Sequence, residues 1–391
     1  MLAVDTTVTS RTRANTGVQR VTREFTKCLS NICDVQPLCY NQGIQRWQVP
    51  AKGSLVRIFH QEDLSPSRRR GSRSRPWTVL QKLLEPRNYS RTIPPFPLAG
   101  FIEPEIFTPQ IHKALQGFLQ YVNGPSLALY YDATPLKLPE LSPRGNTGRF
   151  PAYLRQLLHF NGIAAISETS KQELLGFWKW MGINEHPPVE AIPLAVDLAH
   201  HRTLSTKPEK RMPTVLCVGT IEGRKNQISL LQAADSLWEK GQRFKLTLLG
   251  LASRSTSNPA TTFLDKLLAK GRPVEWLGPR SENDLRTQYA TCHFTVYPSL
   301  AEGFGLPVLE SLKHGKPCIC SSQGAIGEVS TKGGCLTVDH PSPTQLAAAI
   351  EKLLTDSKLH EQLRTEARER HFRTWSDYAS DILQFHKSLA G

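Results

Sequence analysis

The sequence contains no apolar run that approaches the ~20 residues needed by a membrane-spanning helix. It begins directly with a strand-like segment, without the basic residues and long apolar stretch of a secretory signal peptide. Its eight cysteines include no C-x-x-C pair, so their spacing indicates neither a zinc site nor a redox motif. We therefore expect a cytoplasmic protein with buried, reduced thiols and no metal site.

The chain length of 391 residues predicts two domains, because a single core stops growing at roughly 250 to 300 residues. Short apolar segments alternate with amphipathic ones in both halves, which is typical of a doubly wound parallel sheet. Residues 200–213 are polar, basic and aperiodic, as a linker is. We expect an α/β protein with Rossmann-like domains over residues 1–200 and 201–375, followed by a terminal helix over residues 376–391.

The first half contains candidate strands whose carboxyl ends are places where open α/β sheets bind ligands. These strands cover residues 2–4, 55–59, 127–131 and 163–166, and a last one begins at residue 189. The spacing of Val18, Val21, Phe25 and Leu29 predicts a helix that begins at Gly17. A glycine before free backbone N–H groups can bind a phosphate, and the alternative is simply a tight turn between strand and helix.

The second half repeats the pattern with a strand over 214–218, a turn that starts at Gly219, and a helix. The turn carries Arg224 and Lys225, whose acidic neighbour in the sequence is Glu222. Two cations at a helix start oppose the helix dipole, which favours a functional role over a decorative one. A guanidinium fork and an ammonium group at this place can converge on a diphosphate.

Residues 298–310 put two carboxylates and two glycines at the junction of a strand, 294–297, and a helix. Gly303 and Gly305 let the backbone approach a ligand closely. Pro307 suits the first helical position, and the free N–H groups there favour anionic or hydroxyl oxygens.

The two glutamates of this stretch face different parts of the same predicted space. Glu302 precedes the glycines, and Glu310 falls in the first helical turn, where it could accept hydrogen bonds from a vicinal diol such as a ribose. For either glutamate alone, an acidic helix start after a glycine turn is the plain alternative. The combination with the glycines favours a ligand site.

The segment from Glu302 to Glu310 resembles the Glu-x7-Glu signature of retaining glycosyltransferases of the GT-B fold, family 4. The turn after Gly219 resembles the diphosphate-binding element of that family, and the loop at Gly17 resembles its N-terminal glycine loop. The resemblance is dense over residues 214–330 and thin over residues 40–120. It implies two facing Rossmann-like domains with a cleft between them, and a final helix that crosses back to the first domain.

The resemblance also implies roles for individual residues. In the family, the first glutamate and the backbone after it hold the transferred sugar, and the second glutamate holds the ribose. The catalytic residues implied here are Asp132, Arg224, Lys225 and Glu302. The donor-binding residues implied are Gly17, Gly219, Asn226, Gly278, Gly303, Phe304, Gly305, Leu306 and Glu310.

One position departs from the family pattern. Family members often have His-Asp before a hydrophobic-x-Pro segment, whereas this chain has Tyr131-Asp132. A tyrosine can donate a hydrogen bond, but it cannot shuttle a proton at neutral pH as a histidine does. Asp132 could orient an acceptor hydroxyl, and capping of the following turn is an equally good explanation for it.

The resemblance implies transfer of a sugar, with retention, from a nucleotide-diphosphate sugar to a hydroxyl of a glycan or lipid-linked acceptor. GDP-mannose ranks ahead of a UDP-sugar as the expected donor, and neither a cofactor nor a metal is implied. A nucleotide-sugar epimerase or a phosphorylase on the same fold is the alternative among enzymes. A nucleic-acid-binding protein is a remote alternative that rests on the net charge of +14 alone.

The densest basic block comprises Arg68, Arg69, Arg70, Arg73 and Arg75 beside Trp77. A solvated loop is one reading of such a block. Arginines next to a tryptophan and leucines also suit the headgroups of an anionic membrane, so peripheral binding to the inner membrane face is a second reading, and binding of an anionic acceptor is a third.

Overall fold

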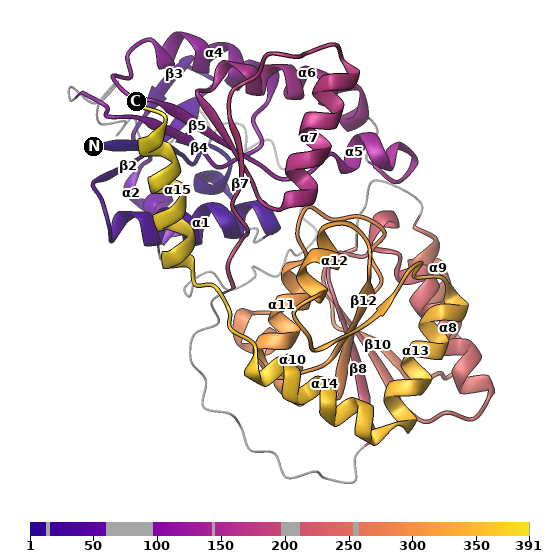
Figure 1. Ribbon diagram of the computed structural model, residues 1–391. Coiled ribbons are helices and arrows are strands. Elements are labelled where there is room, and N and C mark those ends of the chain that lie inside the picture. The colour runs from indigo at the N-terminus through magenta and orange to yellow at the C-terminus, as the bar shows by residue number, and fades with distance from the viewer. Residues whose placement is uncertain (13–15, 60–96, 143–144, 197–211, 253–257, 391) are drawn as a thin grey trace. The chain divides into compact units, whose positions relative to one another are not determined.

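The structure is a computed structural model that describes residues 1–12, 16–59, 97–142, 145–196, 212–252 and 258–390 (Figure 1). The basic block at residues 68–77 and most of the predicted linker lie outside the described residues. None of the helices in the described part combines the length and the apolar character needed to cross a membrane.

Seven of the described strands form one sheet in the order β3-β2-β1-β4-β5-β6-β7. Strand β1 pairs in parallel with β2 and β4, and β4 pairs in parallel with β5, whereas β3 is an antiparallel edge strand on β2. The strands are β1 (Leu2–Asp5), β2 (Val35–Asn41), β3 (Arg46–Gln48), β4 (Phe101–Glu103), β5 (Ser126–Tyr130), β6 (Gly162–Ala165) and β7 (Val189–Ala191).

The helices that connect these strands begin where capping residues favour a helix start. Thr108 and Ser167 each accept a hydrogen bond from a backbone N–H three residues later, as N-cap side chains do. The helices are α1 (Gly17–Ser30), α2 (Lys52–Phe59), α4 (Pro109–Leu119), α5 (Thr134–Lys137), α6 (Asn146–Gln156) and α7 (Glu168–Trp180).

The prediction of a strand over residues 55–59 is wrong, because this segment lies in the helix α2. Its apolar residues are too few to distinguish the two periods, and Leu55 and Ile58 share a helical spacing of three. The sheet is extended instead by β2 and β3, which the sequence analysis did not predict. The predicted strands at 2–4, 127–131 and 163–166, and the helix from Gly17, are confirmed to within one residue at each end.

Six further strands form a parallel sheet in the order β10-β9-β8-β11-β12-β13. The predicted strands over 214–218 and 294–297 are confirmed residue for residue. The strands are β8 (Thr214–Val218), β9 (Lys245–Leu249), β10 (Val274–Trp276), β11 (Phe294–Tyr297), β12 (Cys318–Ser321) and β13 (Cys335–Val338).

Helices cover both faces of this second sheet, with α8, α9 and α13 on one face and α10, α11 and α12 on the other (Figure 1). The sequence analysis did not predict α14. The helices are α8 (Gln227–Glu239), α9 (Pro259–Ala269), α10 (Glu282–Thr291), α11 (Leu306–Lys313), α12 (Gly324–Ser330), α13 (Pro343–Thr355), α14 (Ser357–Glu369) and α15 (Trp375–Ser388).

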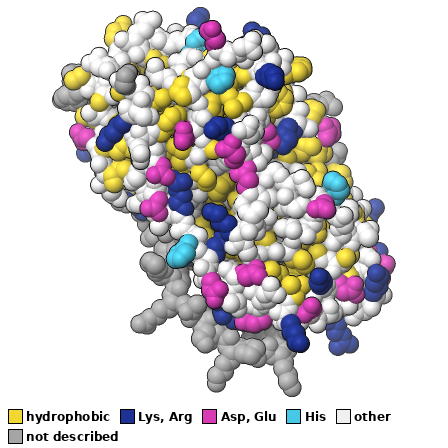
Figure 2. Space-filling view, viewed as in Figure 1, with side chains coloured by type: hydrophobic (Ala, Val, Ile, Leu, Met, Phe, Trp, Pro, Cys, Tyr) yellow, Lys and Arg dark blue, Asp and Glu magenta, His cyan; other side chains and the backbone are white. Residues whose placement is uncertain are grey.

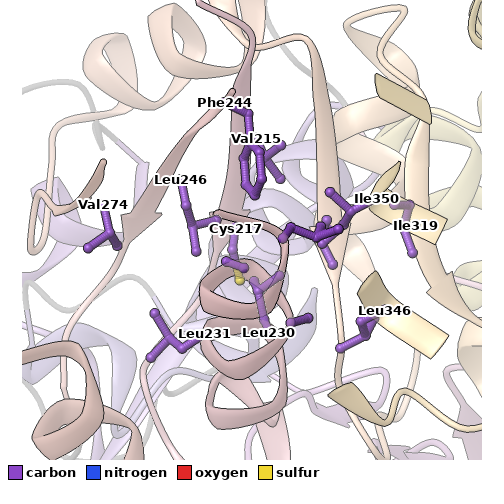
Figure 3. Packing of buried hydrophobic residues seen from close by; sticks show 14 of the residues in the cluster. Val215, Cys217, Leu230, Leu231, Phe244, Leu246, Val274, Ile319, Leu346 and Ile350 are labelled. Carbon is purple, nitrogen blue, oxygen red and sulfur yellow. The ribbon is translucent and has the colours of Figure 1, made fainter. Parts of the chain in front are cut away.

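The core of this part lies between the sheet and the helices α8 and α13 (Figure 3). Val215 of β8, Leu246 of β9 and Ile319 of β12 are fully buried against Leu230 and Ile350 of the two helices. Each buried aliphatic side chain stabilises the fold by roughly 1.5–3 kcal/mol relative to an exposed one. This packing fixes the carboxyl ends of β8, β9 and β11, where the glycine-rich turns begin.

The chain forms two compact units, each made of more than one segment. One unit contains Met1–Leu129, Gln156–Ile163 and Ala379–Gly391, and the other contains Tyr130–Arg155 and Ala164–Tyr378. The two sheets themselves divide between β7 and β8, near the predicted boundary at residue 200. The turns that follow β8, β9 and β11 therefore belong to one unit, together with the residues that follow β5.

Gly250 provides a test of how tightly these turns pack. A Cβ atom at Gly250 would lie 2.1 Å from the carbonyl oxygen of Gly219, and the φ of Gly250 is +144°. Gly271 also has a positive φ, +69°, but a Cβ atom there meets nothing within 4 Å. We expect Gly250→Ala to lower the free energy of unfolding by roughly 3 kcal/mol or more and Gly271→Ala by roughly 1 kcal/mol. Urea unfolding of both variants measures the difference, and equal losses would contradict the close packing of the two turns.

Candidate active site

The turn after β8 brings two cations to the carboxyl end of the sheet. Residues Gly223–Lys225 form a 3₁₀ turn, and Asn226 then takes a left-handed conformation with φ of 55° before α8 begins. The side chain of Asn226 is bonded within the protein: its amide donates to the carbonyl of Pro341 at 2.7 Å, and its oxygen accepts from Ser229 Oγ at 2.7 Å. Asn226 thus shapes the turn that presents Arg224 and Lys225.

Both cations bind the carboxylate of Glu302, which lies in the loop after β11. Arg224 Nη1 is 2.8 Å from Glu302 Oε2, and Lys225 Nζ is 2.5 Å from Glu302 Oε1. Arg224 Nη2 also lies 2.9 Å from Oε1 of Glu222, the neighbour seen in the sequence. Three of the four residues predicted to be catalytic therefore meet in one ion-pair network, across more than seventy positions of sequence.

The electrostatics of this network are those of a buried anion between two cations. Burial alone would raise the pKa of Glu302, but Lys225 and Arg224 outweigh it and lower that pKa to about 2. Burial disfavours the charged form of Arg224, yet Glu302 and Glu222 more than compensate and raise its pKa. For Lys225, burial dominates and lowers the pKa in spite of the nearby carboxylates. The network holds a carboxylate that stays ionised at every physiological pH.

Two residues that the sequence analysis missed complete the network. Ser299 Oγ donates to Glu302 Oε1 at 2.5 Å and lies 3.2 Å from the carbonyl oxygen of Arg224. Lys225 Nζ donates to the phenolic oxygen of Tyr297 at 2.6 Å. The available signal was the presence of a polar tyrosine and serine at the end of an otherwise apolar strand.

The glycine loop after Glu302 is held against residues that follow β5 and β6. The carbonyl of Gly303 accepts hydrogen bonds from Ser167 Oγ at 2.8 Å and from Ser170 Oγ at 3.1 Å. A Cβ atom at Gly303 would lie 2.3 Å from the carbonyl oxygen of Tyr131, so the close approach requires glycine. Gly305, with φ of +118°, turns the chain into α11.

Helix α11 begins one residue earlier than the proline predicted. It starts at Leu306, Pro307 is its second residue, and the preceding Phe304 is buried. The N–H groups of this first helical turn, together with the loop from Gly303 to Gly305, form the edge at which an anionic oxygen is favoured.

Glu310 lies deeper than expected, in the second turn of α11 rather than the first. Its side chain is buried, with 3% of the residue exposed, and Tyr289 Oη of α10 donates to Glu310 Oε2 at 2.7 Å. The ring of Tyr289 stacks on His314 at a centroid distance of 4.9 Å. The correction follows from the helix starting one residue before Pro307, and it makes Glu310 a carboxylate that is already fixed by a protein hydroxyl.

Asp132 shows the capping contact that was its alternative explanation. Its Oδ1 accepts a hydrogen bond from the backbone N–H of Thr134 at 2.8 Å, at the start of α5. Arg224 nevertheless senses the charge of Asp132, which is one of the smaller causes that raise the pKa of Arg224. Tyr131, at the position where the family often has histidine, is buried, and its carbonyl accepts from Ser170 Oγ at 2.7 Å.

The remaining predicted glycines occupy three turns. Gly219 has φ of +147° and Gly278 has φ of +66°, and the N–H of Gly250 donates to the carbonyl of Gly278 at 3.0 Å. These two glycines thus lie on the turns after β8 and β10, on either side of the turn after β9 that contains Gly250. Gly17 is the first residue of α1, in the other unit of the chain, and its predicted role toward a diphosphate stays a prediction. No group of three metal-ligating side chains occurs within the described ranges.

The parallel second sheet has glycine turns at its carboxyl end, and two cations gather there on a largely buried carboxylate, which suits a phosphorylated ligand rich in hydroxyl groups. Comparison with known proteins agrees. The family described as "Glycosyl transferases group 1" matches residues 203–370.

Relatives among characterised proteins include mannosyltransferases of Escherichia coli. O-antigen chain mannosyltransferase B is 26% identical over 309 residues, which cover 71% of this chain and 76% of that protein. Serotype-specific mannosyltransferase WbdA is 24% identical over 275 residues, 65% of this chain but only 32% of that protein. The chain therefore spans about a third of WbdA.

Some of the solved structures that resemble this chain match it over nearly its whole length. Sucrose-phosphate synthase from Thermosynechococcus elongatus superposes with a TM-score of 0.66 at 15% identity, covering 99% of this chain and 98% of that one. HepE of Anabaena, in complex with UDP and glucose, gives a TM-score of 0.65 at 14% identity and covers 99% of each chain. The fold is GT-B, as expected, and the comparisons together support a glycosyltransferase.

The low pKa of Glu302 predicts that the free energy of unfolding falls at acid pH. A pKa lowered from 4.5 to about 2 stabilises the fold fully above pH 4.5, and this contribution is lost as the pH falls toward 2. We expect the free energy of unfolding of the wild type to exceed that of Glu302→Gln at pH 6, and the gap to shrink by roughly 2 kcal/mol at pH 3.

Urea titrations over this pH range measure the gap. Glu361→Gln is the control, because Glu361 is exposed and pairs with Arg364 three residues along α14 at 3.0 Å. A gap between wild type and Glu302→Gln that does not change with pH would contradict the ion-pair network.

Proposed function

We propose that the protein is a retaining glycosyltransferase that moves a hexose from a nucleotide-diphosphate sugar to a hydroxyl of a glycan or lipid-linked acceptor. The observation that carries the proposal is the network in which Arg224 and Lys225 meet on Glu302 beside the glycine loop. Such a network offers two preorganised cations to a leaving diphosphate and a hydrogen-bond acceptor to a sugar hydroxyl.

The chemistry follows from the charges. Cleavage of the bond between the sugar and the diphosphate places negative charge on the departing phosphate oxygen. Arg224 and Lys225 are already held in place, so little reorganisation opposes the stabilisation of that charge. Together with the N–H groups at the start of α11, they supply the positive charge needed, and the proposal therefore includes no metal and no cofactor.

Glu302 has a second role in this proposal. Glu302 and Glu222 together balance the charges of the two cations, and an incoming diphosphate competes with Glu302 for them. The oxygens of Glu302 that are released in this exchange can then accept hydrogen bonds from hydroxyls of the transferred sugar. Binding of the donor diphosphate thus frees Glu302 to bind the sugar of the same donor.

Retention at the anomeric carbon is the expected outcome. Glu302 is engaged by two cations and Ser299, and Asp132 accepts a backbone hydrogen bond of its own turn. Neither carboxylate is thus poised as a covalent nucleophile. Attack from the same face as the leaving diphosphate, with the diphosphate oxygen taking the acceptor proton, fits this arrangement.

The donor and acceptor remain matters of proposal. Relatives named as mannosyltransferases favour GDP-mannose, and the complex of HepE with UDP and glucose keeps a UDP-sugar next in rank. A cytoplasmic enzyme that meets a lipid-linked acceptor at the inner membrane face is consistent with the O-antigen relative. The anchoring role proposed for Arg68, Arg69, Arg70, Arg73, Arg75 and Trp77 concerns residues outside those described.

The alternatives gain nothing from the structure. On the face shown in Figure 2, basic and acidic side chains of the described residues are interspersed, whereas a nucleic-acid-binding face gathers its basic residues. The phosphorylase and epimerase alternatives have no comparison in their favour.

The test of the function is turnover with defined donors. We expect release of nucleoside diphosphate from GDP-mannose or a UDP-sugar in the presence of an acceptor, and a fall in kcat of about 10²- to 10³-fold in Arg224→Ala and Lys225→Ala. Arg272→Ala is the matched control, since Arg272 is also ion-paired, with Asp235 at 2.6 Å, but lies outside the network. Near-wild-type turnover in both site variants would remove these cations from the mechanism.

The two glutamates should separate in binding experiments. Glu310→Gln is expected to weaken binding of free GDP or UDP about tenfold, because a ribose hydroxyl loses a charged acceptor. Glu302→Gln is expected to leave that affinity undiminished, because the diphosphate no longer competes with a carboxylate, yet to weaken binding of the sugar-bearing donor. Calorimetry with both ligands on both variants distinguishes the roles, and equal losses for the two ligands would refute the assignment.

A further inference from the structure

Tyr297 is the last residue of β11, and its side chain ends at Lys225. The residue is buried, and its phenolic oxygen accepts a hydrogen bond from Lys225 Nζ at 2.6 Å. The same ammonium group lies 4.9 Å from the centre of the tyrosine ring. Because β11 is a central strand that pairs with β8 and β12, the position of this hydroxyl is fixed by the sheet itself.

The hydrogen bonds of the ammonium group can be counted. A lysine ammonium has three N–H donors and no acceptor. Glu302 Oε1 takes one at 2.5 Å and Tyr297 takes a second. Among the described residues, these partners leave one N–H direction for a ligand oxygen. Two fixed partners at the end of a flexible side chain define where that third N–H points.

The surroundings explain why a second partner is needed. The side chain of Lys225 is 12% exposed, and its partial burial lowers its pKa by disfavouring the charged form. The charged and titratable groups that face it are Glu302 and the more distant Glu222, which favour the ammonium, the guanidinium of Arg224, which opposes it, and the thiol of Cys217 on β8. The hydroxyl of Tyr297 is a neutral group that accepts from Lys225 and is also bonded to the Glu302 side chain; burial, and then Glu302, raise its pKa, so it stays protonated.

We propose that Tyr297 is a positioning residue for the transfer reaction, which holds the Lys225 ammonium beside Glu302 with its third N–H directed at the donor diphosphate. The inference rests on the proposed function for the nature of the ligand. It adds a residue to the site that neither the motif resemblance nor the comparisons assign, and it makes the end of β11 part of the diphosphate-binding apparatus.

The test uses Tyr297→Phe, which removes the hydroxyl and keeps the ring. Calorimetry with GDP and UDP between pH 7 and pH 10 should show about tenfold weaker binding than wild type at pH 7. The loss of affinity with rising pH should begin about one pH unit lower, because the ammonium without its acceptor deprotonates more easily. If Tyr297 had only a structural role, Tyr297→Phe would lower thermal stability without changing the pH at which the affinity begins to fall. Tyr378→Phe, which alters another buried tyrosine in α15, is the matched control.

A double-mutant cycle shows whether Tyr297 acts through Lys225. In the Lys225→Ala background, the hydroxyl has no ammonium to position, so adding Tyr297→Phe should change GDP or UDP affinity by less than about twofold. Lys225→Ala also removes the buried charge, so the double variant is measurable even if Tyr297→Phe alone folds poorly. Equal affinity of Tyr297→Phe and wild type, or an equal loss in both backgrounds, would overturn the inference.

A failure of the proposed function can be told apart from a failure of this inference. If the wild type binds neither GDP nor UDP, the proposed function is wrong. The titration of the Lys225 ammonium, followed by nuclear magnetic resonance in wild type and Tyr297→Phe, then decides the matter. A lower midpoint in the variant supports the positioning role, and an unchanged midpoint refutes it.

Discussion

The carboxylate of Glu302 between Arg224 and Lys225 is the interaction on which the rest of the site depends. A buried carboxylate without partners would be strongly disfavoured, and so would two adjacent buried cations. The cost of burying the carboxylate and the cost of burying the cations offset each other only if the turn after β8 and the loop after β11 lie side by side. That condition is met because β8 and β11 are neighbours in the sheet, with Phe294 in register with Val215. The sheet order is therefore a requirement of the electrostatics.

Close backbone contacts also determine how the neighbouring turns pack. Gly303 approaches the carbonyl of Tyr131, and Gly250 approaches that of Gly219, at distances where no side chain fits. Each contact brings carbonyl and N–H groups to the carboxyl edge of the second sheet and leaves no room for a side chain at the glycine. The site therefore consists of backbone groups as well as side chains. This composition suits a ligand with many oxygen atoms, each of which is recognised with little specificity.

Sequence patterns predicted those parts of the fold that local physics determines. The strands 214–218 and 294–297 are short, mostly apolar and β-branched or aromatic segments bounded by turn residues, and both were predicted to the residue. The segment at 55–59 has the same short apolar character but no strand neighbour to pair with, and it forms a helix. Length alone could not separate these cases, because the outcome depends on which partner the rest of the chain supplies.

The candidate site divides in the same way. Glycines, helix starts and the cations were visible in the sequence because their chemistry is local. The contact between Lys225 and Tyr297 joins positions 72 residues apart. The sequence of a buried strand does not indicate in which direction the hydroxyl of its tyrosine points. The depth of Glu310 was misjudged for a related reason, since one residue of difference in a helix start moves a side chain by about 100° around the axis.

The final helix has a consequence for the order in which the protein can be made. Residues from Ala379 onward belong to the unit that begins at Met1, and His386 lies within hydrogen-bonding distance of the carbonyl of Pro125, 2.8 Å away, with its ring against Gly100. These residues follow the whole of the second sheet in the sequence. During synthesis, the first unit therefore cannot receive α15 until the strands of the second sheet have been made.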